Sequence, residues 1–142
     1  ARKEAIREVL WNETENCWLD VLVSNPSQTA QASNQFYPTS LTPLWAGVSH
    51  LDQQGLDKLF ANPRVRQALE FVGGVPSSLV ETGQQWDAPN VWAPHQYFVA
   101  EGLFNVGGLY PPALHYGERI VQRWILTTFC AWNATGVFHL IE

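Results

Sequence analysis

The sequence predicts an all-α fold in which helices are joined by long loops rich in proline and glycine. Several segments repeat apolar residues at helical spacing, and prolines or glycines stand near the ends of those segments. The chain contains no stretch of about 18 or more apolar residues, so none of these segments is expected to span a bilayer.

The first third of the chain mixes one helix with irregular segments. Arg2–Leu10 places apolar residues at helical spacing, and we expect it to be the end of a helix that begins before residue 1. Residues 17–23 form a short apolar run, which predicts either a strand or the lining of a loop. Residues 25–34 are polar and contain Pro26, so we expect an exposed loop there.

Two helices are predicted in the middle of the chain. Gln53–Ala61 repeats apolar residues at helical spacing, and a proline interrupts the pattern directly afterwards. That residue, Pro63, suits the first turn of a second helix. We expect the second helix to run to residue 71 or 72 and to end at the following pair of glycines.

The last two predicted helices are the longest. Residues 93–104 form one, with a proline in its first turn. Two prolines at 111–112 open the other, in which apolar residues at helical spacing predict a broad buried stripe made of Ala113, Tyr116, Ile120, Val121, Trp124, Ile125, Phe129 and Trp132. Beyond Gly136 we expect a final turn that contains Phe138 and Leu140.

Charge and composition narrow the classes of partner. The net charge is −5 and no run of Lys or Arg occurs, which argues against nucleic acid and anionic membranes and favours a neutral substrate. Only 15% of the residues are charged and 46% are hydrophobic, whereas about a quarter of a typical domain is charged. We therefore expect the chain to be one part of a larger protein.

One segment, residues 83–94, has the side chains of a carbohydrate site. The faces of two indoles suit the C–H patches of a pyranose ring, while amide and carboxylate groups suit its hydroxyls. Two prolines stiffen the segment and lead it into the helix that begins at residue 93. The predicted substrate-binding residues are Gln84, Gln85, Trp86, Asp87, Asn90 and Trp92.

The same residues also have a structural interpretation. Composition alone equally allows the two indoles to fill a core. We expect Asp87 to contact a sugar hydroxyl, but its position also suits a cap for the helix that enters at Pro94, or a bond to its own loop.

Residues 83–94, with 74–79 just upstream, are similar to the second signature of the α,α-trehalases of glycoside hydrolase family 37. That signature reads Gln-Trp-Asp-x-Pro-Asn, a small residue, Trp, and then Pro two positions later. Here Val91 is larger than the usual Gly or Ala. Three further segments resemble other family motifs in the same order, namely 18–20, 36–45 and 138–142, although Val21 replaces a usual Tyr.

This resemblance implies part of an (α/α)6 toroid built from helical hairpins, with residues 1–142 as a partial catalytic domain. It implies an inverting enzyme that cleaves α,α-trehalose into two glucose molecules, and we expect no cofactor. The general-acid Asp and general-base Glu of the family fall before and after the matched region, so no catalytic residue is expected in this chain. The remainder of the trehalase is the implied partner.

Two other functions stay open. The first is a non-catalytic carbohydrate-binding or interaction module. Such a module would explain why both catalytic carboxylates are absent. The second is a related (α/α)6 glycosidase that acts on another α-linked disaccharide.

Other kinds of site are less well supported by the sequence. No metal site is predicted, because no metal-ligand spacing occurs among His50, His95, His115 and His139. No nucleophilic serine is predicted, because Gly-x-Ser-x-Gly does not surround Ser40, Ser77 or Ser78.

Two features bear on the compartment. Asn12 and Asn133 lie in Asn-x-Thr sequons, which predicts glycosylation and hence a secreted, cell-surface or lumenal protein. Cys17 and Cys130 are expected either to pair in an oxidising compartment or, as the favoured alternative, to be two buried thiols.

Overall fold

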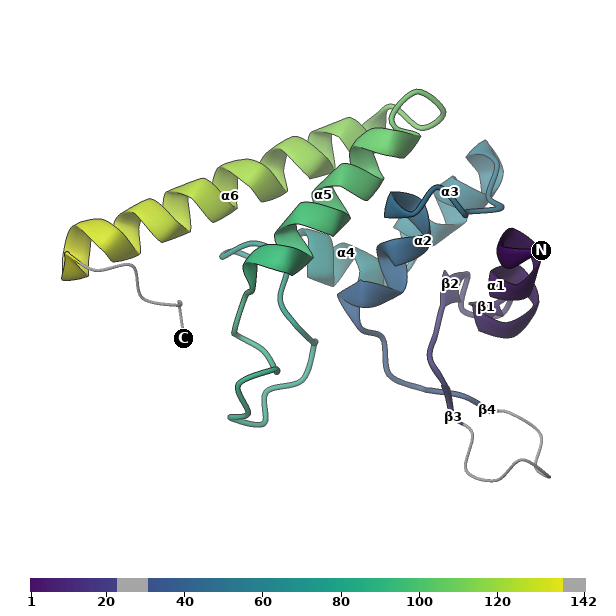
Figure 1. The fold of residues 1–142 in the computed structure, drawn as a ribbon, viewed down its shortest axis with the longest axis horizontal. Coiled ribbons are helices and arrows are strands. Elements are labelled where there is room, and N and C mark those ends of the chain that lie inside the picture. The colour runs from purple at the N-terminus through teal and green to yellow at the C-terminus, as the bar shows by residue number, and fades with distance from the viewer. Residues whose placement is uncertain (23–30, 137–142) are drawn as a thin grey trace.

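The computed structural model describes residues 1–22 and 31–136. This part of the chain is mostly helical, which confirms the predicted fold class (Figure 1). The helices are α1 (Arg2–Leu10), α2 (Thr42–Trp45), α3 (Gln53–Ala61), α4 (Pro63–Leu69), α5 (Ala93–Val106) and α6 (Pro112–Thr135), and a 3-10 turn η1 (Pro38–Leu41) precedes α2. The sequence did not predict η1 and α2.

Two small antiparallel hairpins follow α1. β1 (Trp11–Asn12) pairs with β2 (Cys17–Trp18), and β3 (Val21–Leu22) pairs with β4 (Gln31–Ala32). The apolar run at 17–22 therefore contributes strand residues, one of the two outcomes predicted for it. The loop expected at 25–34 lies mostly outside the described residues, as do Phe138 and Leu140.

Side-chain caps fix where α3 and α4 begin. The Asp52 carboxylate accepts a hydrogen bond from Gly55 N at 2.8 Å in the first turn of α3. The side-chain oxygen of Asn62 accepts one from Arg64 N at 2.8 Å in the first turn of α4, where Pro63 stands. Both caps satisfy N–H groups that have no partner within the helix, so both helices begin at the residues that the sequence predicts.

α4 ends at Leu69, whereas the sequence predicted a helix to residue 71 or 72. The guanidinium of Arg123 on α6 donates to the carbonyl oxygens of Leu69 and Phe71, at 3.0 and 3.1 Å. These bonds satisfy carbonyl groups at the end of the helix. Arg123, more than fifty positions away in sequence, thus holds the chain where α4 ends, before the glycine pair is reached.

The core joins α2, α3 and α4 to α5 and the first half of α6. Its fully buried side chains include Leu44, Leu56, Leu59, Leu103 and Ile120. α2 approaches α5 closely at Gly102, where an added Cβ would lie 2.8 Å from Trp45 N. Any larger residue at Gly102 would therefore push the two helices apart.

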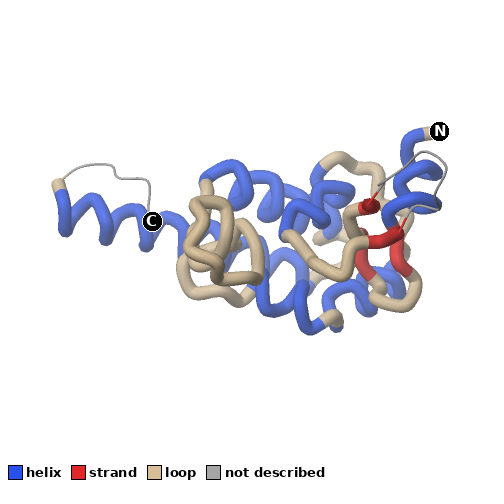
Figure 2. The backbone as a smooth tube through the Cα atoms, turned by 90° about the horizontal axis from the view of Figure 1, so that it is seen from below, coloured by secondary structure: helices blue, strands red, loops and turns tan. Residues whose placement is uncertain are grey.

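The predicted buried stripe of α6 is correct only in its first half. Ala113 and Ile120 are fully buried, but the more distal members are 38, 60, 55 and 42% exposed, namely Val121, Ile125, Phe129 and Trp132. α5 has 14 residues and α6 has 24, so at about 1.5 Å per residue α6 runs past the helix it packs against. Figure 2 shows this outer part of α6 extending beyond the other described elements.

The two cysteines are free thiols in different environments. Cys17 is buried, and its burial raises the pKa of the thiol to about 11. Cys130 is exposed on the outer part of α6. The expectation of two buried thiols is therefore wrong for Cys130, because α6 outruns its covering helix.

Candidate functional site

The predicted sugar-binding residues lie on a closed loop between α4 and α5. We call residues 75–92 the site loop, which is teal in Figure 1 and projects from the helices. An antiparallel bridge joins Pro76 to Val91, and Ser77 N donates to the Asn90 carbonyl oxygen at 3.0 Å. These backbone contacts close the loop at its base, so its tip has a defined shape.

Two indoles are stacked on each other at the surface of the site loop. The ring centroids of Trp86 and Trp92 are 4.3 Å apart and the rings are inclined by 19°. Trp86 is 59% exposed, and the Trp92 indole N–H donates to the Gln85 carbonyl oxygen at 3.3 Å. One face of Trp86 is therefore covered by Trp92, which is itself tied to the loop. Within the described chain, Trp86 therefore fills no core.

Asp87 is held by hydroxyl groups of its own loop. One carboxylate oxygen accepts from the Ser78 hydroxyl at 2.8 Å, and the other accepts from the Thr82 hydroxyl. Hydrogen bonds from the Thr82 hydroxyl, which has the larger effect, and from the Ser78 hydroxyl lower the pKa of Asp87 below its ordinary value. The N-cap residue of α5 is Trp92, and its side chain makes no capping hydrogen bond. Of the structural alternatives, Asp87 therefore fixes its loop and does not cap the helix.

Of the three side-chain amides predicted to bind sugar, one makes a hydrogen bond within the loop and two do not. Asn90 donates through its side chain to the Gln85 carbonyl oxygen at 3.2 Å. The side-chain amides of Gln84 and Gln85 are exposed and make no hydrogen bond within the described part of the chain. Both amides, on the same loop as Trp86, thus keep their full capacity for a ligand.

The site contains supporting residues that sequence analysis missed. Ser78 and Thr82 bond Asp87, and Gln96 on α5 is buried against the base of the loop. Their types gave no signal, because serine, threonine and glutamine are mostly surface residues. The one available indication is that Gln96 follows Trp92 by four positions, which places both on one side of the first turn of α5.

His95 lies beside the stacked indoles. Its ring meets Trp86 edge to face, with centroids 6.5 Å apart, and meets Phe98 in the same way at 5.5 Å. Burial lowers the pKa of His95 below its ordinary value. His95 is therefore neutral at neutral pH and acts as an aromatic support for Trp86.

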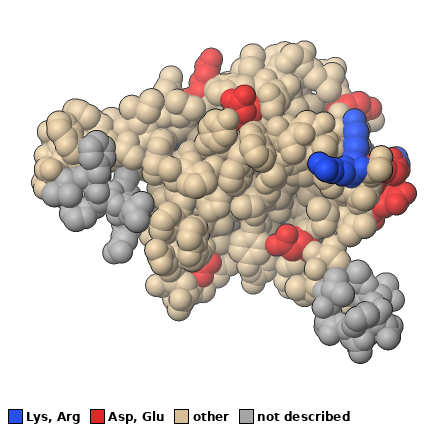
Figure 3. All heavy atoms as spheres, viewed as in Figure 1, with Lys and Arg blue, Asp and Glu red and all other residues tan. Residues whose placement is uncertain are grey.

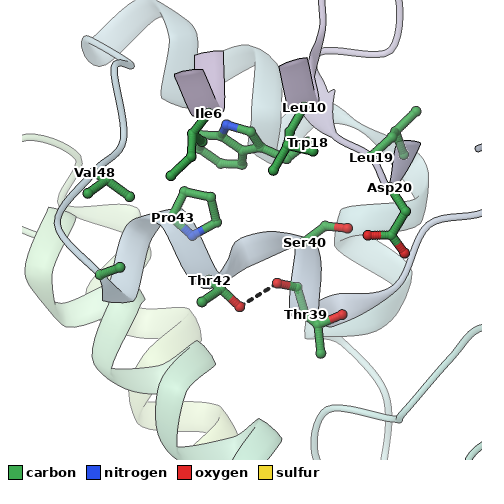
Figure 4. A pocket seen from close by; sticks show the side chains of 11 residues that line it. Ile6, Leu10, Trp18, Leu19, Asp20, Thr39, Ser40, Thr42, Pro43 and Val48 are labelled. Atoms are coloured by element: carbon green, nitrogen blue, oxygen red, sulfur yellow. Dashed lines mark hydrogen bonds between the residues drawn. The ribbon is translucent and has the colours of Figure 1, made fainter. Parts of the chain in front are cut away.

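Two cavities lie away from the site loop. One of about 200 Å³ is mainly apolar and is lined by α1, β2, η1 and α2, with Ile6, Trp18 and Pro43 in its walls and Asp20 and Ser40 beside them (Figure 4). The other, of about 370 Å³, is more polar and includes residues of α1 and α3. None of the six predicted substrate-binding residues lines either cavity.

The remaining predictions concern metals, membranes and sequons. No group of three or more His, Cys, Asp or Glu residues that could hold a metal ion occurs within residues 1–22 and 31–136. Across the same residues, no helix is long and apolar enough to cross a membrane. Asn12 lies on β1, where its side-chain oxygen accepts from Thr14 N and Glu15 N, each at 3.0 Å. Asn133 is exposed near the end of α6.

Comparison with known proteins points to one family. The family model described as Trehalase matches residues 1–142. A probable trehalase of Oryza sativa subsp. japonica is 32% identical over 98% of this chain and 27% of its own length. Trehalases of Oryctolagus cuniculus and Homo sapiens are each 37% identical over 97% of this chain, and over 23 and 22% of their own lengths. The chain thus spans about a quarter of the length of the curated relatives it matches.

Proposed function

This chain belongs to the trehalase family, and we propose that it supplies part of the sugar-binding wall of an enzyme that cleaves α,α-trehalose into two glucose molecules with inversion. The family match supports the substrate and the reaction. The site loop supports the role of this chain, because its open indole face and free amides have the chemistry of a pyranose site.

The observation on which this proposal depends most is the open face of Trp86. Trp92 covers the opposite face, with the two ring centroids 4.3 Å apart, and its indole N–H donates to the Gln85 carbonyl oxygen. Trp86 is therefore held in place without a ligand. A preorganised aromatic surface binds with little loss of side-chain freedom. Gln84 and Gln85 precede Trp86 on the loop, and their exposed amides, which have no hydrogen-bond partner in the described part of the chain, are available for the hydroxyls of a sugar stacked there.

Asp87 fits a binding role better than a catalytic one. In an inverting glycosidase one carboxyl group protonates the leaving oxygen, so its pKa must be raised, and the second activates a water; the two carboxyl groups stand about 6.5–9.5 Å apart to leave room for that water. The pKa of Asp87 is lowered by the Thr82 and Ser78 hydroxyls, so the group stays ionised. It suits an acceptor for a sugar hydroxyl, and the acid and base are supplied by other parts of the full natural protein.

We also propose that the exposed apolar side of α6 packs against other helices of the same natural protein, as an (α/α)6 toroid requires. Ile125, Phe129 and Trp132 together form an apolar surface on successive turns of α6. Exposed patches of this kind mark interaction surfaces. In Figure 3 the Lys and Arg side chains on the face shown gather near the end that holds α1.

A secretory route is proposed from the two sequons. Asn12 lies where the chain turns between two strands, and Asn133 lies on an exposed surface of α6, close to the apolar side. If α6 is covered as proposed, a glycan on Asn133 would obstruct the contact, so we expect Asn12 to be the modified residue. Peptide mass spectrometry of the protein secreted by a eukaryotic host tests this, and a glycan on Asn133 alone would contradict it.

The proposed function is tested with Trp86→Ala in the full natural protein. Loss of the stacking surface should lower kcat/KM for trehalose by about 10- to 100-fold, because a misplaced sugar reacts slowly. Trp86→Phe keeps an aromatic face and should retain most of the activity, which makes it the matched control. Unchanged kinetics of Trp86→Ala at unchanged stability would remove the site loop from the sugar site.

The same protein distinguishes the two other functions. Binding of trehalose without release of glucose would indicate a non-catalytic binding module. Faster release of glucose from maltose or kojibiose than from trehalose would indicate a related glycosidase for another α-linked disaccharide.

A further inference from the structure

In addition to the backbone contacts at its base, the two ends of the site loop are joined by a buried side-chain amide. Gln96 on α5 is 4% exposed, and all of its hydrogen-bonding atoms point at backbone groups of the loop. Its side-chain oxygen accepts from Val75 N at 2.6 Å, and its side-chain nitrogen donates to the Val75 carbonyl at 2.7 Å and to the Trp92 carbonyl at 3.0 Å. Both ends of the loop are therefore held by one side chain.

Burying a glutamine is unfavourable unless its amide is fully used. The long side chain loses conformational freedom, and an unpaired buried amide costs further free energy. At Gln96 the oxygen and both N–H groups of the amide have partners. Such complete use of a buried polar group indicates that it specifies one arrangement of the chain around it.

The backbone beside the amide is adapted to it. Gly74 has φ +122°, a left-handed conformation, and an added Cβ would lie 2.5 Å from the side-chain oxygen of Gln96. Any other residue at Gly74 would be strained and would also push the amide aside. The glycine that precedes the loop and the glutamine that follows it thus form one structural unit.

This unit is linked to the indole surface through Trp92. The Gln96 side chain donates to the Trp92 carbonyl, together with the backbone N–H groups of His95 and Gln96 in the first turn of α5. The Trp92 indole N–H is bonded to Gln85, and its ring covers one face of Trp86. A change in the backbone at Trp92 would therefore rotate or release the ring on which Trp86 rests. No other described side chain bonds both Val75 and Trp92.

We propose that Gln96, with Gly74 beside it, is the positioning residue of the sugar-binding surface: it sets the orientation of Trp92 and so presents the open face of Trp86 to a glucosyl ring. This inference rests on the proposed function for its role in sugar binding. The positioning itself is a property of the protein without sugar and is tested separately.

The experiment compares Gln96→Leu with Asn62→Leu in the full natural protein. Asn62 is a buried amide whose side chain also makes three hydrogen bonds to backbone groups, but it caps α4 away from the site loop. Both variants lose a buried amide of similar connectivity. Any effect that appears only in Gln96→Leu is therefore specific to the loop.

Two readouts are used. Stacked indoles give an exciton-coupled band in near-ultraviolet circular dichroism, and Gln96→Leu should lose the part of this band that Trp86→Phe also removes. The KM for trehalose should rise by about tenfold or more in Gln96→Leu, with a smaller change in kcat. Asn62→Leu should change neither the band nor KM, although it lowers stability.

Two further variants keep the test decisive if Gln96→Leu does not fold. Gln96→Glu keeps the acceptor for Val75 N but loses both amide N–H donors, so it should weaken the band partially. Gly74→Ala should weaken it by displacing the amide from the other side. An intact band in both variants would overturn the proposal.

The outcomes separate the two levels of the inference. If Gln96→Leu abolishes the band and raises KM, the positioning role is supported. If it abolishes the band while KM changes in neither Gln96→Leu nor Trp86→Ala, the proposed function fails and the inferred role in sugar binding fails with it, although the amide still positions the indoles. If the band and KM match those of Asn62→Leu, Gln96 is an ordinary buried residue and the proposal is wrong.

Discussion

The site loop and the outer part of α6 both expose large aromatic side chains, but they hold them in different ways. On the loop, Trp86 is stacked on Trp92, and Trp92 is bonded through its indole to Gln85. On α6, the rings of Phe129 and Trp132 contact each other, with centroids 5.8 Å apart and planes inclined by 44°. These two are 55 and 42% exposed, on a stretch of helix that extends past α5.

The aromatic side chains of the site loop and those of α6 are exposed for different reasons. The site loop is ordered by several specific side-chain bonds, among them those of the buried Ser78 and Gln96, and the result is an aromatic surface that faces outward. Ordering α6 requires only helix formation and packing of its first half. Trp86 is therefore exposed as a constructed feature, whereas the apolar side of α6 is exposed because the described chain does not supply a partner for it.

The largest effect on stability is expected from alanine substitutions at two isoleucines of α6. Ile120 is fully buried and Ile125 is 60% exposed in the described chain. In the full natural protein, Ile120→Ala should lower the free energy of unfolding by about 2–5 kcal/mol, because it leaves a cavity. If other helices cover α6 as proposed, Ile125→Ala should cost a comparable amount. Urea unfolding of both variants gives the measurement.

The contrast between the isoleucines also shows how the proposal for α6 would fail. A cost below about 0.5 kcal/mol for Ile125→Ala is typical of a surface substitution. With Ile120→Ala still destabilising, that result would mean that the outer part of α6 faces solvent in the full natural protein. Arg119→Ala, on an exposed part of the same helix, is the control for general effects on helix propensity.

Sequence analysis predicted the helices well where the signals were local. Apolar spacing and prolines predict α3, α5 and α6, and the end of α1 at Leu10, correctly. The predicted end of α4 was wrong; in the structure the carbonyls of Leu69 and Phe71 are bonded by Arg123 of α6, a distant contact that local spacing does not indicate. The burial of Ile125 and Phe129 was wrong for a similar reason, since periodicity shows which residues share a face but not whether another element covers it.

The candidate site shows the same division between local and distant information. The chemical types in residues 83–94 indicated a sugar site, and the structure brings Trp86 and Trp92 together on one loop. The contribution of Gln96 was missed, because its partner Val75 is 21 positions away and nothing in the sequence marks the pair. Whether Gln84, Gln85, Asp87 and Asn90 contact a sugar stays a prediction.

The smallest expected effect concerns the pH dependence of the loop. Hydrogen bonds from Thr82 and Ser78 lower the pKa of Asp87 in the folded protein. The ionised carboxylate therefore adds stability that is fully present above the unfolded pKa of about 3.9, and that is lost as the pH falls through the lower folded pKa. Asp87→Asn removes this contribution. The difference in unfolding free energy between the natural protein and Asp87→Asn should be larger at pH 6 and should shrink below about pH 4.

Asn90→Ala is the matched control for that measurement, because it also removes a polar contact from the site loop but no titratable group. Its cost in stability should be the same at pH 6 and in acid. A gap between the natural protein and Asp87→Asn that widens on acidification would mean that the hydroxyls favour the protonated carboxyl group. In that case Asp87 would have the raised pKa of a proton donor, and the assignment of this chain to the binding wall alone would have to change.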